Sequence, residues 1–245
     1  MPKKKQSDVD VWLGRETPRV RKALENASRH LDPQSGFTVH TLEAMYAQES
    51  SFGTLMGKRG VSGPAGHFQM KADVARSYHL IVTKRNDQRF NIDLVSPAAA
   101  QYLSKQYRNF STRMVLSADR ITVPVKDASE RQKFAFAAYN VGGGRVAEAQ
   151  RLAVKAGKNP QVWDQVQRFL EQAGSDEVEA AQARHYVEQV PVYEMEFLQK
   201  SLAGKNTKDK TAKKGEYRCI DGHWVTMDDR HVMICDSKDS GSKSG

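Results

Sequence analysis

A glutamate within an apolar helical stripe is the first candidate for chemistry in this chain. The stripe consists of Leu42, Met45, Tyr46, Glu49 and Phe52, which fall on one face at helical spacing. We expect Gly53 to end this helix, which places Glu49 in the last turn, at the negative end of the helix dipole. Burial and the dipole both disfavour a carboxylate, so a raised pKa is predicted for Glu49. A carboxylic acid protonated near neutral pH can protonate the leaving oxygen of a glycosidic bond. On position alone, a glutamate at the edge of an amphipathic helix is the alternative interpretation.

Two glycine-containing stretches follow Glu49 and carry side chains suited to binding a sugar. Residues 62–70 read SGPAGHFQM, and residues 138–146 read AYNVGGGRV. The glycines of the first stretch let the backbone approach a sugar closely, and the Gln69 amide supplies both a donor and an acceptor. Tyr139 and Asn140 end a predicted helix next to glycines, which an aromatic helix end with an Asn cap would also explain.

These stretches, together with Glu49-Ser50-Ser51-Phe52, occur in the order of a known family. They resemble the E-S-x-[FW], G-[LIPW]-[MW]-Q and A-Y-N-x-G-x-G-R-V motifs of lytic transglycosylases with a goose-lysozyme-like fold (SLT domain, glycoside hydrolase family 23). Residues 87–103 and 184–187 are similar to further segments of the membrane-bound lytic murein transglycosylase D group. The resemblance extends over residues 10 to 200 or so and implies a lysozyme-like, mainly α-helical domain.

The resemblance also implies the roles of individual residues. Glu49 would serve as the single general acid and then as the base. The 2-acetamido group of N-acetylmuramic acid would assist, and the 6-hydroxyl of the same sugar would attack the anomeric carbon, which gives a 1,6-anhydro product without consuming water. The residues expected to bind substrate are Ser50, Ser62, Gln69, Tyr139, Asn140 and Tyr186. For Ser50, support of the loop in place of contact with the substrate is the alternative. His67, where the family commonly has Leu, Ile or Pro, is interpreted as a cleft-rim variant and not as a ligand.

Other functions remain open at this stage. Glycosidases with two carboxylates need a second Asp or Glu at a set separation from the acid, and none is conspicuous in the motifs. Asp73 is the nearest and opens a predicted helix. The alternatives are a hydrolytic lysozyme of the same fold, an injected or phage-delivered effector that degrades cell wall, and a non-catalytic wall-binding protein. No cofactor or metal is expected.

The composition and charge indicate the class of partner. The chain has 245 residues, a formal net charge of +9, 39% hydrophobic residues and a mean hydropathy of −0.66. A basic surface suits an anionic polymer such as peptidoglycan, whereas no nucleic-acid recognition motif is present; a merely solvated basic surface is the alternative. The basic start lacks the apolar stretch of a secretory signal, so we expect a periplasmic or envelope location after loss of a presequence, or delivery by a secretion system or phage.

The predicted elements before residue 203 are almost all helical. We expect a disordered basic N-terminus over residues 1–7 and one lysozyme-like catalytic domain over 8–203, acting as a monomer. Thr38 or Thr41 is expected to cap the Glu49 helix. The other predicted helices cover residues 8–32, 71–79, 96–110, 129–139, 144–156, 160–170 and 177–202. The 129–139 helix is expected to begin at Ser129, and the 96–110 helix at Ser96-Pro97, with an N-cap followed by Pro. Pro191 is expected to kink or break the final helix.

A different composition follows the helical region. Residues 204–216 read as a Lys-rich flexible linker, residues 217–236 as a small β module, and residues 237–245 as a disordered tail. The predicted strands cover 217–220, 224–227 and 232–235. A disulfide between Cys219 and Cys235 is favoured because so small a unit cannot be held by its core, and two buried free thiols are the alternative. An exposed Trp224 would let the module bind the wall or a protein partner, and packing of Trp224 within the hairpin is the alternative.

Overall fold

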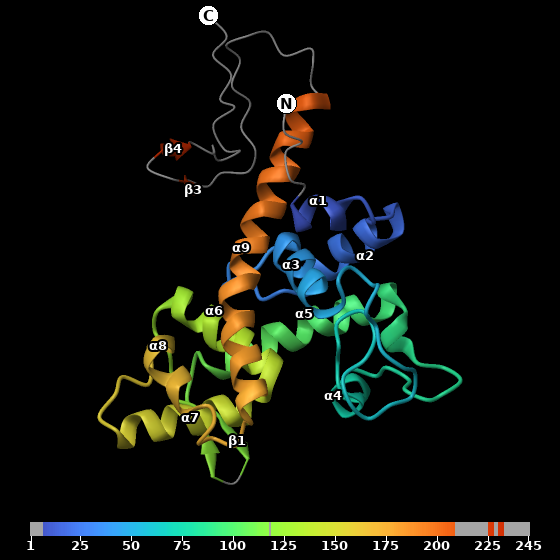
Figure 1. The fold of residues 1–245 in the computed structure, drawn as a ribbon. Helices are drawn as coiled ribbons and strands as arrows, with labels where there is room; N and C mark the ends of the chain where they lie inside the picture. The colour runs from blue at the N-terminus through green and yellow to red at the C-terminus, as the bar shows by residue number, and fades with distance from the viewer. Residues whose placement is uncertain (1–6, 118, 209–224, 228–229, 233–245) are drawn as a thin grey trace, which may run out of the picture. The chain divides into compact units, whose positions relative to one another are not determined.

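The computed structural model describes residues 7–117, 119–208, 225–227 and 230–232. Its main body is built from α-helices, which confirms the predicted fold class (Figure 1). The helices are α1 (Asp8–Leu13), α2 (Pro18–Ser28), α3 (Val39–Ser50), α4 (Ala72–Ser77), α5 (Ile92–Asn109), α6 (Ala128–Ala137), α7 (Gly143–Lys155), α8 (Trp163–Val166) and α9 (Glu177–Lys208). Short 3₁₀ turns, η1 (Gln88–Phe90) and η3 (Gln167–Phe169), and a π-helical turn, η2 (Ala138–Gly142), connect them.

The chain divides into two compact units, Met1–Ser201 and Leu202–Gly245. In the second unit, β3 (Val225–Met227) pairs antiparallel with β4 (Arg230–Val232). The strand predicted over 224–227 overlaps β3. The strand predicted over 232–235 overlaps β4 only at its start, because β4 begins two residues earlier than expected. The strand predicted over 217–220, Trp224 and both cysteines lie outside the described residues. The helix α9 continues to Lys208, into the stretch predicted as linker.

Local capping signals explain why two predicted helices have other bounds. The helix expected over 8–32 is two helices, because Thr17 caps α2 and Pro18 occupies its first position. The helix expected from Ser96 begins at Ile92, where the Asn91 side chain accepts a hydrogen bond from the backbone of residue 93. Pro97 lies inside this helix, and the buried Ser96 hydroxyl donates to the Ile92 carbonyl at 2.7 Å. Pro191 is likewise accommodated within continuous α9.

The helix that carries Glu49 begins at its predicted cap but ends earlier than expected. Thr38 caps α3, as one of the two predicted possibilities. The helix ends at Ser50, and the left-handed residue that follows it is Ser51 (φ 48°), not Gly53. Phe52 (φ 57°) and Gly53 (φ 83°) continue this left-handed turn. Glu49 therefore lies in the last turn of the helix, as predicted, and the chain reverses directly after it.

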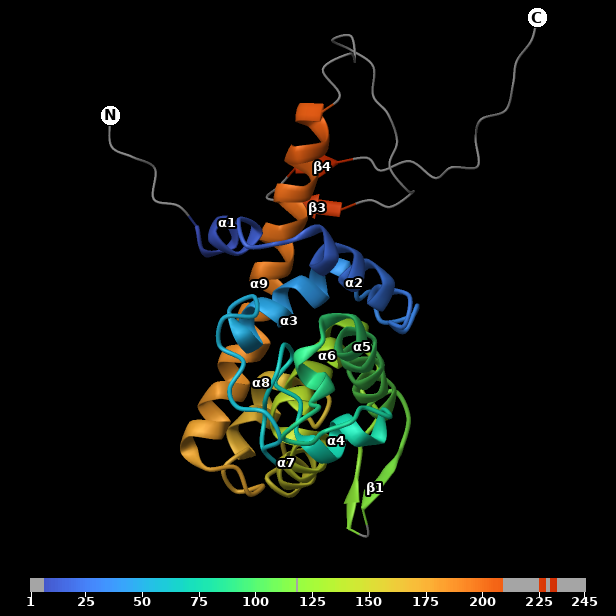
Figure 2. The ribbon, with the colours of Figure 1, turned by 90° about the vertical axis from the view of Figure 1, so that its right-hand side faces the viewer.

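The long helix α9 joins the parts of the helical body, as the two ribbon views show (Figures 1 and 2). Near its start, Glu179 forms an ion pair with Arg145 of α7 at 3.0 Å. Further along, Glu194 accepts hydrogen bonds from the Thr38 and Thr41 hydroxyls at 3.2 and 2.6 Å. Phe197 then stacks on Trp12 of α1 with ring centroids 6.3 Å apart. Since α9 contacts both ends of the body, it positions α3 relative to α7.

A short hairpin in the main body was not predicted from the sequence. β1 (Val115–Ser117) pairs antiparallel with β2 (Arg120–Ile121). The Thr122 hydroxyl, which is buried, donates to the Asn109 carbonyl at 2.8 Å and anchors the hairpin to the end of α5. Strands this short carry too few alternating residues to produce a periodic signal.

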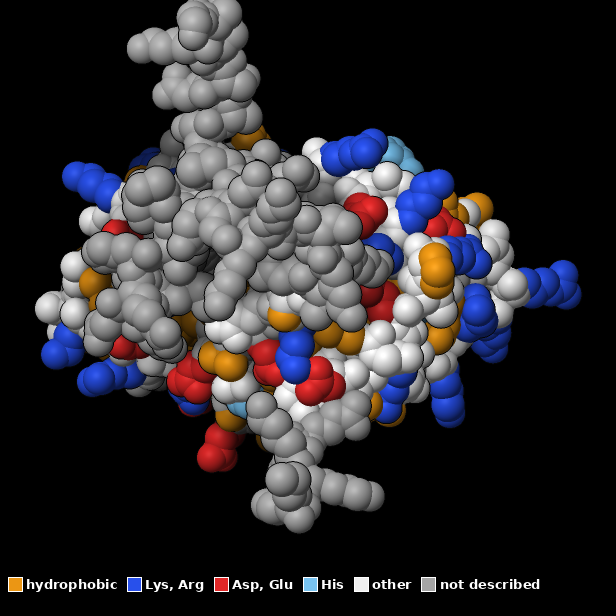
Figure 3. Space-filling model, turned by 90° about the horizontal axis from the view of Figure 1, so that it is seen from above, with side chains coloured by type: hydrophobic (Ala, Val, Ile, Leu, Met, Phe, Trp, Pro, Cys, Tyr) orange, Lys and Arg blue, Asp and Glu red, His pale blue; other side chains and the backbone are white. Residues whose placement is uncertain are grey.

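The described surface is basic but mixed in charge. In the view of Figure 3, lysine and arginine side chains lie around the rim of the visible face, with acidic side chains between them. No described helix combines the length and the apolar character required to cross a bilayer. Nor do the described His, Cys, Asp and Glu side chains gather in threes as a metal site would require.

Candidate active site

Glu49 is a half-buried carboxyl with a raised pKa, as predicted. Burial raises the pKa of Glu49 to about 8, and an interaction with the Tyr186 hydroxyl opposes that rise. Loss of hydration is therefore the dominant cause, because it disfavours the charged form. At neutral pH the protonated carboxylic acid predominates, which is the state that a general acid needs.

Tyr186 brings a polar group from α9 to the Glu49 carboxyl. Its side chain is buried, and its hydroxyl has no hydrogen-bond partner of standard geometry among the described residues. Burial and the nearby Glu49 charge raise the pKa of Tyr186 well above its usual value. A buried, incompletely satisfied hydroxyl beside an ionisable carboxyl is costly in a purely structural role, so this pair marks a candidate reaction centre.

Tyr139 and Asn140 lie in the π-helical turn between α6 and α7. The helix predicted to stop before the glycines instead continues as η2 and leads directly into α7. Such turns recur at functional sites because they displace side chains from the regular helical positions. The Tyr139 ring stacks on Tyr186 with centroids 6.3 Å apart and an interplanar angle of 11°. Asn140, in the same turn, is half-buried.

The Tyr139 hydroxyl connects this turn to the glycine-containing loop. It donates a hydrogen bond to the Phe68 carbonyl at 3.1 Å. In the loop, Gln69 has a left-handed backbone (φ 44°), and its amide nitrogen donates to the Gly66 and Leu55 carbonyls at 2.8 and 3.2 Å. The Gln69 amide nitrogen therefore helps to shape the loop, in addition to the ligand contact expected from the sequence.

The two serines predicted to bind substrate occupy different environments. Ser62 is exposed, and its carbonyl accepts a hydrogen bond from the Ala72 backbone at 3.0 Å. Ser50 is fully buried, with its hydroxyl 2.8 Å from the His67 carbonyl, and it accepts a hydrogen bond from the Gly53 backbone at 3.0 Å. A side chain without exposed surface cannot contact a ligand in a cleft. Its assignment as a substrate-binding residue is therefore corrected to the support of the loop after Glu49.

Sequence reasoning missed the buried arginine that holds the same loop. Arg89, fully buried, forms an ion pair with Asp87 at 2.8 Å. Its guanidinium also donates to the carbonyls of Val61, Gly63 and Met70, at 2.8, 2.8 and 2.9 Å. These carbonyls flank Gln69 on both sides in sequence, so one side chain fixes the whole loop. The motif containing Arg89 was recognised, but nothing local in it indicates which carbonyls the guanidinium would meet.

A glycine in this loop is required by the close approach of Arg89. The backbone of Gly66 is left-handed (φ 81°), and a Cβ added there would lie 2.1 Å from the Arg89 carbonyl oxygen. The neighbouring His67 backbone donates to that same carbonyl at 3.0 Å. The loop therefore packs directly against the main chain of η1, whereas the sequence analysis expected its glycines to let the backbone approach a sugar.

Two further tyrosines extend the aromatic side of the site. Tyr102 of α5 packs on Tyr139 with ring centroids 5.0 Å apart, and Tyr78 packs on Tyr102 at 6.1 Å. Burial raises the pKa of Tyr102 to about 12. Tyr78, Tyr102, Tyr139 and Tyr186 thus form a continuous row of rings, which we call the tyrosine row. Tyr102 lies within a motif used for the resemblance, and that was the only signal that could have identified it.

The carboxyls of Glu43, the nearest in sequence to Glu49, and of Asp73, the nearest in the motifs, interact with other groups. Glu43, fully buried in α3, pairs with Arg21 at 2.6 Å and with His40 at 2.5 Å. Asp73 instead raises the pKa of Tyr102 through its charge. Among the described residues, no second carboxylate contributes to the pKa of Glu49. This arrangement favours chemistry that uses one carboxyl over chemistry that uses a pair.

Comparison with known proteins identifies a family model that matches this part of the chain. Residues 29–162 match the model described as "Transglycosylase SLT domain". This match includes Glu49, Gln69, Tyr139 and Asn140, whereas Tyr186 lies beyond it.

Curated relatives share parts of the sequence. Membrane-bound lytic murein transglycosylase F from Desulfosudis oleivorans is 30% identical over 154 residues, which are 62% of this chain and 28% of the relative. Proteins of the same name from Marinobacter nauticus and Shewanella denitrificans are 48% identical over 52 residues and 34% identical over 84 residues. These two alignments cover 21% and 31% of this chain, and 9% and 17% of the respective relatives. The chain thus spans less than a third of the length of each relative. The specific resemblance to the D group stays a prediction.

Proposed function

Because this chain belongs to the transglycosylase SLT domain family, we propose that it is a peptidoglycan lytic transglycosylase. It would cleave the β-1,4 bond between N-acetylmuramic acid and N-acetylglucosamine and leave a 1,6-anhydro-muramic product. The observation that carries this proposal is the single half-buried Glu49 with a pKa of about 8, beside the Tyr186 hydroxyl. The names of the relatives, all lytic murein transglycosylases, support the substrate class.

In the proposed mechanism Glu49 performs two proton transfers. Protonated Glu49 first donates its proton to the glycosidic oxygen as the bond to the anomeric carbon breaks, and the 2-acetamido oxygen of the muramic sugar bonds to that carbon. The Glu49 carboxylate then accepts the proton of the 6-hydroxyl, whose oxygen attacks the anomeric carbon and displaces the acetamido oxygen. A pKa near the working pH suits both steps, since a group far from that pH performs only one of them well. Glu49 ends in its starting protonation state.

The residues around Glu49 would supply the substrate site. We assign the glycine-containing loop with Ser62 and Gln69 to one wall and the turn with Tyr139 and Asn140 to the other, with Tyr186 beside the acid. Aromatic rings present apolar faces on which sugars pack, so the partly exposed rings of Tyr78 and Tyr102 are suited to a carbohydrate, with the buried rings of Tyr139 and Tyr186 behind them. Ser50 would hold the loop from within.

The product distinguishes this proposal from its main alternative. Purified murein sacculi would be digested with the full chain, and the soluble muropeptides analysed by mass spectrometry. We expect 1,6-anhydro products and none with a reducing muramic end. Products heavier by one water would instead identify a hydrolytic lysozyme. Absence of soluble products, with retained binding to sacculi, would identify a wall-binding protein.

The remaining assignments follow from the substrate. We propose that the chain acts as a monomer on the cell wall, in the periplasm or envelope or after delivery by a secretion system or phage. We also propose that the segment after the helical domain contacts the wall or a protein partner. The formal net charge of the whole chain, +9, supports an anionic polymer as the partner.

A further inference from the structure

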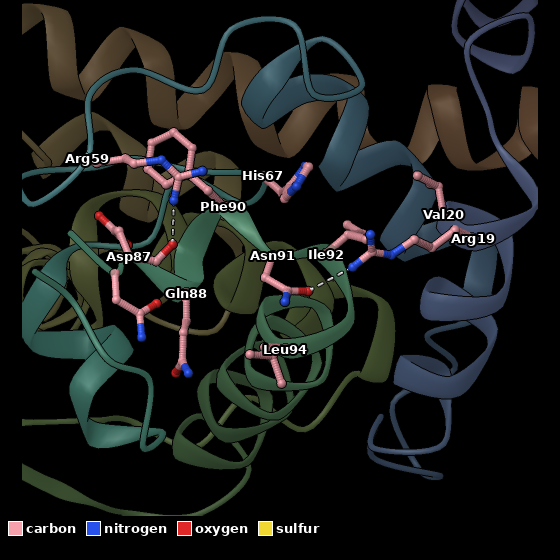
Figure 4. A pocket seen from close by; sticks show the side chains of 11 residues that line it. Arg19, Val20, Arg59, His67, Asp87, Gln88, Phe90, Asn91, Ile92 and Leu94 are labelled. Carbon is pink, nitrogen blue, oxygen red and sulfur yellow. Dashed lines mark hydrogen bonds between the residues drawn. The ribbon is translucent and has the colours of Figure 1, made fainter. Parts of the chain in front are cut away.

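A pocket of about 480 Å³ lies between the N-terminal ends of α2 and α5, the turn η1 and the loop that carries Arg59 and His67. Figure 4 shows the Arg59 and Arg19 guanidinium groups on opposite sides of it, with Asn91 between them. None of the residues that line it belongs to the set of Glu49, Gln69 and the tyrosine row. Its volume is within the usual range of ligand pockets. The mechanism proposed for Glu49 does not use it.

The pocket presents positive charge without an available carboxylate. The carboxyl of Asp87, which lines it, is fully buried and is taken up by Arg89 and by the Gly60 backbone, at 2.8 Å each. Arg19 pairs with Asp93 at 2.6 Å. Arg59 has no ion pair with any described residue; its guanidinium stacks 4.5 Å from the Phe90 ring centroid and donates one hydrogen bond, from Nη1 to the Asp87 carbonyl at 3.2 Å, which leaves its other N–H groups for a ligand (Figure 4).

Two of the amide side chains that line the pocket, those of Gln88 and Asn91, have their oxygens bound by backbone N–H groups. The Gln88 side-chain oxygen accepts a hydrogen bond from the Ile81 backbone at 2.7 Å. The Asn91 side-chain oxygen accepts one from the Asp93 backbone at 3.1 Å. A backbone N–H can only donate, so these contacts identify the oxygen of each amide and leave its NH₂ group to bind a ligand. Together with Arg59, the pocket therefore selects a ligand that accepts hydrogen bonds and carries negative charge.

We propose that this pocket binds a carboxylate of a short peptide, with Arg59 as its principal ligand. An arginine fork matches a carboxylate in two parallel hydrogen bonds. With one unpaired arginine, the pocket is better suited to a single carboxylate than to a chain of phosphates. The apolar side chains of Val20, Ile92 and Leu94 complete a lining suited to a peptide. This inference rests on the proposed function, because the peptide stems of peptidoglycan carry such carboxylates.

The pocket shares its loop with the candidate active site. Arg59 and His67 belong to the loop that contains Gln69, and the His67 carbonyl is held by Ser50, next to Glu49. A peptide bound at Arg59 would thus be anchored on the loop that forms one wall of the proposed glycan site. Stems attached to the glycan would then help to set its position along the cleft.

The test is an NMR titration of the full chain with the tripeptide Ala–γ-Glu–diaminopimelic acid. We expect saturable shifts of the Arg59, Gln88 and Asn91 signals, and about tenfold weaker binding for Arg59→Gln, as expected for loss of a charge-assisted contact. Arg59→Lys, which keeps the charge without the fork, should bind with intermediate affinity. Arg113→Gln, which removes another exposed arginine, should bind as the wild type does.

Three results would overturn this inference. They are absence of saturable binding to the wild-type chain, equal weakening by Arg59→Gln and Arg113→Gln, and unchanged affinity for the tripeptide with all carboxyls amidated. A glycerol-phosphate oligomer is titrated in parallel. If it binds more tightly than the tripeptide and depends on Arg59, the ligand of the pocket is a phosphate polymer and not a peptide. Peptide binding by Glu49→Gln should match the wild type. Peptide binding can therefore be measured even if the chain does not catalyse the proposed reaction. Likewise, the product analysis remains valid if the peptide does not bind.

Discussion

The Tyr186 hydroxyl of α9 interacts with the Glu49 carboxyl of α3 and holds the pKa of that carboxyl lower than burial alone would place it. Among the described residues the hydroxyl has no other partner. The interaction favours ionised Glu49, which is the state required when the proposed mechanism turns from acid to base. Tyr186 is thus a candidate for tuning the proton transfer, in addition to packing against Tyr139.

Removal of this hydroxyl should move the pH profile of the reaction. In Tyr186→Phe the pKa of Glu49 should rise above the wild-type value of about 8, because only burial remains. The fall in kcat at high pH, where the acid becomes deprotonated, should therefore shift to higher pH. Tyr107→Phe, which removes a hydroxyl bound to the Gln34 carbonyl at 3.0 Å, is the matched control and should leave the profile in place. An unshifted profile for Tyr186→Phe would separate Tyr186 from the proton transfer.

Glu49→Gln should abolish turnover and preserve the fold. General acid–base groups contribute about 10²–10⁴ in rate, so kcat on sacculi should fall by at least this range while binding persists. The loss of turbidity of a sacculi suspension measures turnover, and the amount of protein that sediments with the sacculi measures binding. Turnover at close to the wild-type rate would remove Glu49 from the catalytic role.

The same variant should be more stable than the wild type at alkaline pH. The pKa of Glu49 is raised from 4.5 to about 8 on folding, so between these values the folded chain binds a proton that the unfolded chain has released. This proton stabilises the fold at low pH, and the stabilisation is lost as the pH rises through that window. Glu49→Gln has no such proton to lose. Its melting temperature should therefore exceed that of the wild type increasingly from pH 5 to pH 8, and equal Tm differences across this range would contradict the raised pKa.

Arg89→Met should destabilise the domain far more than loss of a surface pair. Breaking a buried ion pair by removing one partner costs about 3–5 kcal/mol, because Asp87 and the loop carbonyls lose their donor. Arg151→Gln, in which an exposed pair with Glu148 is broken, should cost less than about 1 kcal/mol. Urea unfolding of both variants gives the two values. A loss of similar size in both would mean that Arg89 does not hold the loop.

Truncation after Lys208 should leave the helical domain folded. The contacts that tie α9 to the body include the stacking of Phe197 on Trp12 and the ion pair of Lys200 with Asp10 at 2.5 Å, both of which the truncation keeps. The main thermal transition and the cleavage of short soluble glycans should therefore persist. Binding to intact sacculi should weaken if the removed segment contacts the wall. Disappearance of the main transition would show that the segment belongs to the catalytic fold.

Much of the candidate site could be predicted because its signals are local. The apolar stripe around Glu49 and the cap at Thr38 act within a few residues, through backbone hydrogen bonds and helical spacing. The motif order then indicated the family. Two predicted helix ends were wrong. Asn91, and not Ser96, caps α5, so the helix begins at Ile92. Ser51, and not Gly53, is the first left-handed residue after α3.

The sequence by itself therefore determined a mainly helical SLT domain with Glu49 in the last turn of an amphipathic helix. The tertiary structure alone decided that Tyr186 meets Glu49, that Ser50 is turned inward, and that Arg89 binds the carbonyls on both sides of Gln69. These contacts join residues far apart in the chain, and their geometry depends on how α9 and η1 pack against the loop. Burial raises the pKa of Glu49, and the extent of that burial is a property of the packed fold rather than of any local pattern.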